Sequence, residues 1–184
     1  MQESQRVNAS RSLIDEKEFK EKYQKECSEG ISSLGISYTH IRSLRDIVGP
    51  RTKKIIAYHS FLESLDGFED TDGIEIAYLG FNRLSAFREK DAKIKEIGIL
   101  DLAGNPITSL RNCPPCKQLI VSSTKTVNLV GCPEGVEIVR CGHSDHLLSL
   151  HGCPKSVKIV ECSCAPNLKI CAEDLPLDLE ELIQ

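Results

Sequence analysis

The 184-residue sequence contains no tryptophan, and aromatic residues make up only 5% of it, so any core that it forms must be mainly aliphatic. It also lacks an apolar run long enough to cross a membrane, and its first residues lack the apolar stretch of a secretory signal. A large charge excess is absent too. The net charge is −4 and the pI is about 5.8, which excludes a chain that binds polyanions over its whole surface. We therefore expect one soluble, cytoplasmic domain, with a nuclear location as the alternative.

A repeated spacing of apolar residues is the main feature that is present. The clearest unit is residues 97–114, where the pattern LxxLxLxxNxIxxL is carried by Ile97, Leu100, Leu102, Asn105, Ile107 and Leu110. The same frame recurs, less regularly towards the end of the chain, around Leu34, Ile55, Ala77, Leu119, Val139 and Val160. Successive units lie about 19 to 23 residues apart, a period that indicates stacked repeats.

The pattern resembles the leucine-rich repeat over residues 31–184, and the segments VGCPEGVEIV and HGCPKSVKIV resemble its short, 20-residue subtype. This resemblance implies an α/β solenoid with a parallel β-sheet on its concave face. It also implies protein binding without catalysis and without a cofactor. We expect an N-terminal helical cap over residues 1–30, about seven repeats over residues 31–171 and an acidic C-terminal cap over residues 172–184.

The spacing has a direct physical reading. Leu-x-Leu alternation is the period-two pattern of a strand with one buried face, so each unit predicts one strand. Three residues after the second leucine, a polar side chain is needed to satisfy backbone groups in a buried turn. We place in that turn Thr39, Ser60, Asn82, Asn105, Thr124 and Asp145. In the last unit Pro166 and Asn167 fall there, which leaves its turn undefined.

Residues 9–29 predict a helix that covers the first repeat. Phe19, Tyr23 and Cys27 recur every four residues, so they share one helical face. The opposite face is rich in lysine and glutamate. Ser10 or Ser12 is expected to cap the helix start, and Gly30 to end it.

The nine cysteines form an odd count, and eight of them follow residue 112. The repeat frame predicts packing roles for Cys113, Cys132, Cys141, Cys153, Cys162 and Cys171. It gives no such role to Cys27, Cys116 and Cys164. We expect no bound metal, because a row of repeat-spaced thiols does not converge as a tetrahedral site requires. A zinc-stabilised module that includes the histidines at 143, 146 and 151 stays as an alternative.

The concave side of such a solenoid exposes the residues between and just after the inward leucines. Three of the four tyrosines fall there, all in the first three units. Tyrosine on an exposed strand face is typical of a recognition surface, although these rings could also simply cover the sheet or meet the helix. The predicted protein-binding residues are Tyr38, Tyr58, His59, Tyr78, Phe81 and Asp101.

A basic segment, HIRSLRDIVGPRTKK, gives a competing surface. It carries one acid against five bases, which are the predicted RNA-contacting residues Arg42, Arg45, Arg51, Lys53 and Lys54. Clustered Lys and Arg suit a phosphate backbone, since their binding releases counterions. Runs of charge are more often solvated surface, and reading of bases would need further groups.

Motifs of catalysis are lacking: the sequence shows no glycine-rich phosphate loop, nucleophile elbow or helical metal motif. We therefore expect no enzyme. The favoured function is an adaptor or regulator that holds a protein partner on its concave face. The alternative is a component or regulator of a ribonucleoprotein, such as a ribosome-associated protein. We expect a monomer or a subunit of a hetero-complex, with no membrane contact.

Overall fold

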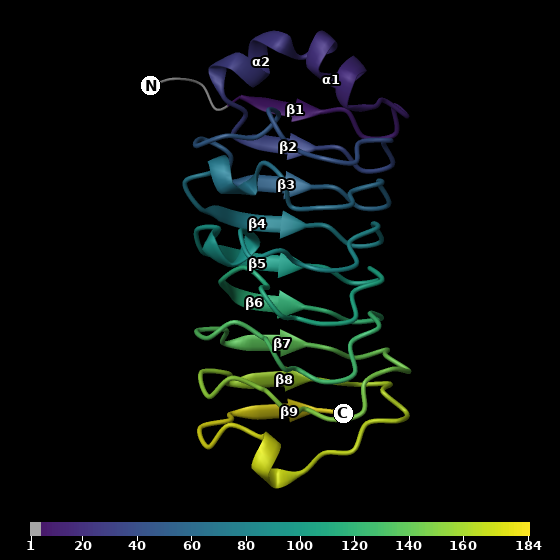
Figure 1. Cartoon of the computed structure of the whole chain (residues 1–184), viewed down its shortest axis with the longest axis vertical. Coiled ribbons are helices and arrows are strands. Elements are labelled where there is room, and N and C mark those ends of the chain that lie inside the picture. The colour runs from purple at the N-terminus through teal and green to yellow at the C-terminus, as the bar shows by residue number, and fades with distance from the viewer. Residues whose placement is uncertain (1–4) are drawn as a thin grey trace.

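The computed structural model describes residues 5–184, which form a parallel β-solenoid of stacked coils (Figure 1). Its sheet has nine strands in the order of the sequence, and each strand pairs in parallel with the next. The strands are β1 (Arg6–Asn8), β2 (Ser33–Gly35), β3 (Lys54–Ile56), β4 (Ile74–Tyr78), β5 (Ile97–Asp101), β6 (Cys116–Ile120), β7 (Ile138–Arg140), β8 (Ile159–Glu161) and β9 (Glu181–Ile183).

The register of the sheet stacks the inward side chains of one coil on those of the next. Leu34 pairs with Ile55, and further along the sheet Leu100 pairs with Leu119. These residues are buried. The next inward residue, two positions further along each coil, is also buried, from Ile36 in the second coil to Cys162 in the eighth. The predicted strand-per-repeat solenoid is therefore confirmed, with a mainly aliphatic core.

A column of buried polar side chains follows the strands at the predicted turn. The Asn105 amide donates to the carbonyls of Leu79 and Leu102, both at 2.9 Å, and its oxygen accepts from the backbone of Leu84 at 3.1 Å. Asn82 makes the equivalent set of bonds one coil earlier. Because each amide bridges two coils, this column satisfies backbone groups that the turn would otherwise bury unpaired.

In two coils the predicted position of this column is wrong. Ser144, and not Asp145, occupies the buried position after Cys141, and its hydroxyl donates to the Thr124 carbonyl at 3.3 Å. This coil has one extra residue, which lies after the turn. Counting back from the next leucine therefore places the turn one residue too late, at Asp145. In the last coil the position falls to Ala165, which has no side-chain donor, and not to Pro166 or Asn167.

Two short helices, α1 (Glu16–Lys22) and α2 (Gln24–Glu29), lie beside β1 at the N-terminal end of the sheet (Figure 1). Phe19 is fully buried, as its spacing predicts, and Gly30 ends α2 with φ of 91°. The predicted serine cap is wrong. Asp15 caps α1 through a reciprocal capping box with Glu18, so the helix begins at Glu16 and not near residue 10. Residues 1–4 of the expected 1–30 cap lie outside the described residues.

Before three of the strands the chain makes one-turn 3-10 helices: η1 (Phe68–Asp70), η2 (Asp91–Lys93) and η3 (Ala172–Asp174). Coil length varies on this approach to the strands. Within residues 5–184, no helix combines the length and the apolar character that crossing a bilayer requires.

Candidate binding surface on the strand side

Every coil from the first to the eighth places one residue in the left-handed backbone region. This residue comes four positions after the inward residue that is in register with Leu34. The residues in this column are Arg11, Tyr38, His59, Phe81, Gly104, Ser123, His143 and Cys164, with φ between 51° and 68°. Such a φ is uncommon for non-glycine residues, and bulky ones most of all. The turn thus dictates the backbone at this column and leaves the choice of side chain open.

In three consecutive coils the column holds stacked rings, which we call the aromatic ladder: Tyr38, His59 and Phe81. The ring centroids of Tyr38 and His59 are 5.0 Å apart, and those of His59 and Phe81 are 4.6 Å apart, with interplanar angles of 12° and 6°. This spacing follows from the strand spacing of a sheet. Tyr38 and Phe81 are 46% and 50% exposed.

The two ends of the aromatic ladder have different neighbours. The Arg11 guanidinium lies over the Tyr38 ring, 5.8 Å from its centroid. At the other end the Phe81 ring covers Gly104, where a Cβ atom would lie 2.5 Å from the ring. The ring faces within the aromatic ladder are therefore covered, as is the face of Phe81 over Gly104, whereas Arg11 is too far from Tyr38 to cover its outer face.

A second aromatic group lies nearer the strands. The rings of Tyr58 and Tyr78 stack with centroids 5.8 Å apart, and the Tyr58 hydroxyl donates to Asp101 at 2.6 Å. Gly80 leaves room for the Tyr58 ring, since a Cβ atom there would approach it to 2.7 Å. Burial, followed by the bond to Asp101, raises the pKa of Tyr58, so this phenol stays a neutral donor.

The structure thus brings the six predicted protein-binding residues together on adjacent coils. One of them is not available as a contact. Asp101 is only 7% exposed, and its carboxylate accepts both from Tyr58 and from the backbone of Ala103. The prediction that Asp101 is exposed is wrong because the Tyr58 ring reaches across to it. Asp101 therefore orients Tyr58 and stays covered.

A row of residues that the sequence analysis missed lies next to the aromatic ladder, two residues further along each coil. Here the Arg83 guanidinium lies 4.0 Å above the Phe61 ring, and His40 meets the same ring edge-on at 5.0 Å. With Arg42 and the start of α1, this row lines a cavity of about 460 Å³. The repeat frame could have found it, because these positions directly follow the buried polar column.

The predicted basic surface is divided by the fold. Arg42 faces Glu63 at 3.8 Å, and Arg45 faces Asp66 at 3.5 Å. Both guanidinium groups point to acids of the next coil, so their charge is partly compensated. The linear charge run does not show this because the acids are about twenty residues away in sequence.

The other three basic residues lie on different parts of the coil. Arg51 donates to the carbonyl of Glu29 at 2.8 Å, and Lys53 donates to that of Gly73 at 3.0 Å. Lys54 lies on β3, where it lines a cavity of about 330 Å³ together with Lys53 and other residues of the first coils. The five residues therefore do not form one patch.

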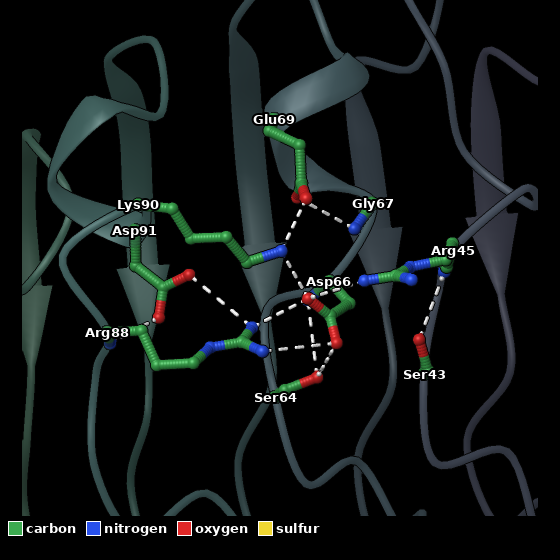
Figure 2. Close-up of polar contacts among 9 residues, drawn as sticks. All are labelled: Ser43, Arg45, Ser64, Asp66, Gly67, Glu69, Arg88, Lys90 and Asp91. Carbon is green, nitrogen blue, oxygen red and sulfur yellow. Dashed lines mark hydrogen bonds and ion pairs between the residues drawn. The ribbon is translucent and has the colours of Figure 1, made fainter.

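An ion network joins three coils on the approach to the strands (Figure 2). Asp66 accepts from Arg88 at 2.7 Å and from Lys90, and it also faces Arg45. Lys90 additionally contacts Glu69. The Arg88 guanidinium, ahead of its other partners, holds the pKa of Asp66 well below its ordinary value. Each charge in this network has an opposite partner, so we assign it to stabilising the coils.

The cysteines follow the predicted packing roles with two exceptions. Cys141 and Cys162 are buried at inward strand positions, as expected. Cys116 is buried as well, although no core role was assigned to it, because it is the register partner of Ile97. Burial raises its pKa to about 12. Cys171, expected at a closing leucine position, is exposed in the looser last coil.

Within the part of the chain that the structure describes, no three His, Cys, Asp or Glu side chains are grouped so that they could hold a metal ion. His151 contacts Asp174 at 3.2 Å, but nearby Cys153 has its pKa raised to about 11 by burial, so its thiol stays protonated near neutral pH. No protein-family model matches the chain, and no curated protein is significantly similar to it in sequence.

Proposed function

We propose that this chain is a non-enzymatic binding module of the leucine-rich-repeat type, an adaptor or regulator that holds a protein partner on the strand side of its solenoid. In this proposal α1 and α2 are its N-terminal cap, and the aromatic ladder is the centre of the contact. One observation carries the proposal: exposed aromatic rings occupy a backbone position that later coils fill with residues as small as glycine and serine.

The choice of rings at this column has an energetic cost. A non-glycine residue in the left-handed region costs about 1–2 kcal/mol relative to an ordinary conformation. The same column accepts Gly104 and Ser123 in later coils, so the turn itself does not require a ring. Stacking offsets part of the cost, yet Tyr38 and Phe81 remain about half exposed. Rigid exposed aromatics of this kind favour a recognition role.

The left-handed column also provides a test that leaves the fold intact. Asparagine tolerates this conformation better than other non-glycine residues, so Tyr38→Asn and Phe81→Asn remove the rings without straining the turn. We expect the double variant to retain its circular dichroism spectrum and to lose proteins that the wild-type chain captures from a lysate, as identified by mass spectrometry.

The matched control is Ser123→Asn, which makes the same backbone demand two coils past Phe81 and is expected to capture the same proteins as wild type. If the double variant and the control capture identical sets, the aromatic ladder is not the binding centre and the proposal fails.

RNA contact is the second candidate, as part of a ribonucleoprotein. The observation in its favour is the cavity that Arg6, Lys53 and Lys54 line on the first strands. Phosphate binding there would weaken steeply with salt, and Lys54→Gln would lower both the affinity and the salt slope. Binding that is unchanged by Lys54→Gln would exclude this candidate.

A further inference from the structure

The two arginines that lie over aromatic rings on the strand side have no acidic partner among residues 5–184. Arg11 lies over Tyr38, and Arg83 lies over Phe61. Neither guanidinium makes an ion pair or a hydrogen bond to a described residue. The Phe61 ring holds the Arg83 side chain in place, and the N–H groups of both arginines stay open to an external acceptor. Arg83 is therefore a preorganised donor, and Arg11 is a second donor held less closely.

The acids nearest to these arginines are already engaged. Asp15 accepts from the backbone of Glu18 as the cap of α1. Glu16 accepts from the backbone N–H groups of both Arg42 and Ser43. These carboxylates are held by the backbone and line the same cavity as Arg83, but among the described residues neither forms an ion pair with its guanidinium.

The aromatic ladder, which has Arg11 at one end and Arg83 beside it, adds to the same polarity. Aromatic rings are negative on their faces and positive at their edges. The faces between Tyr38, His59 and Phe81 are covered by one another, and Phe81 lies on Gly104 at one end. A ligand along the aromatic ladder therefore meets mainly positive ring edges, with Arg11 near the Tyr38 end and Arg83 in the neighbouring row. Nucleic-acid bases, which stack on open ring faces, find only the outer face of Tyr38.

From this geometry we infer that the partner contributes an acidic segment, lying in extended conformation along the solenoid axis with carboxylates on Arg11 and Arg83. This inference rests on the proposed protein-binding function and names its partner class. Arg11 and Arg83 are three strand spacings apart, about 14 Å along the axis. An extended chain covers that distance with about four residues. The segment thus carries two acids about four positions apart, with apolar or small residues between them over the ring edges.

The test uses the full chain and a fluorescein-labelled eight-residue peptide with two glutamates four positions apart. A peptide with glutamine at both positions is the ligand control, and an oligothymidylate of equal length is the polyanion control. In fluorescence polarisation we expect the glutamate peptide to bind at least about tenfold more tightly than the glutamine peptide. It should also bind more tightly than the oligothymidylate.

Arg83→Gln and Arg11→Gln are each expected to raise the dissociation constant of the glutamate peptide about five- to tenfold. The control variant Arg111→Gln changes an exposed arginine away from the aromatic ladder, and we expect it to leave the dissociation constant of the glutamate peptide unchanged. The inference is overturned if the two peptides bind alike, if Arg83→Gln has no effect, if the glutamate peptide does not bind, or if the oligothymidylate binds as well as the peptide. If lysate capture still depends on Tyr38 and Phe81 in such a case, only the acidic partner class is wrong and the proposed function stands.

Discussion

Replacing Gly104 by alanine tests the aromatic ladder from its closed end. Gly104 has φ of 68°, and a Cβ atom there would lie 2.5 Å from Cδ1 and 2.6 Å from Cε1 of Phe81. Real Cβ atoms do not approach so closely, so the Phe81 ring must leave its place over the glycine. We expect the ring to lose its contact with His59 and the variant to be less stable.

Two effects add up in this variant. Alanine in the left-handed region costs about 1–2 kcal/mol. Loss of one stacked ring pair costs about 0.5–1.5 kcal/mol. The expected loss in the free energy of unfolding is therefore about 2–3 kcal/mol. Gly135→Ala is the matched control, because Gly135 has φ of 88° and a Cβ atom there would meet no other atom within 4 Å, so this variant carries only the backbone cost.

Urea unfolding followed by circular dichroism measures both variants, and a second background makes the comparison sharper. In the presence of Phe81→Asn, the cost of Gly104→Ala should fall to that of Gly135→Ala, a coupling of about 1 kcal/mol. An equal cost of Gly104→Ala in both backgrounds would show that Phe81 does not lie over Gly104, and the closed end of the aromatic ladder would be refuted.

Other perturbations test the coils. Asn105→Ala leaves buried backbone groups of two coils unpaired and should lower the free energy of unfolding by about 3 kcal/mol in urea titrations; a neutral result would contradict the buried column. Iodoacetamide near neutral pH should label exposed Cys164 within minutes and buried Cys141, whose pKa burial raises, only on unfolding; equal rates by mass spectrometry would refute this packing. Asp66 has its pKa lowered on folding, so its contribution to stability is present above its ordinary pKa and is lost as the pH falls below about 4. Asp66→Asn should therefore flatten the acid limb of the stability curve, and an unchanged limb would contradict the network.

Much of the fold follows from the sequence because the repeat constrains it strongly. A period-two pattern fixes which side chains of a strand point inwards, and stacking at a constant interval fixes the parallel register. Leu100 and Leu119 could be paired on that basis alone. Where the interval changes, as it does after Cys141, the sequence does not show on which side of the turn the extra residue lies, so Ser144 was missed.

The candidate surface was predictable in outline and not in its contacts. The frame identifies Tyr38 and Phe81 as neighbours on the exposed side, because it needs only the strand positions. It does not show that Tyr58 reaches Asp101 and covers it, since that depends on side-chain conformations across two strands. The pairing of Arg45 with Asp66 was hidden for the same reason.

The coils differ in length, from 19 residues between Leu100 and Leu119 to 27 between Val7 and Leu34, yet the interval from strand to left-handed residue is constant. Insertions and deletions are thereby confined to the far side of each coil. A linker, an epitope tag or an entire reporter domain inserted after Gly135, in the turn before β7, should leave the spacing of the ring column unaltered. The segments that vary in length are therefore separate from the strands and the ring column, whose spacing is constant, so loops can be engineered without altering the proposed binding surface.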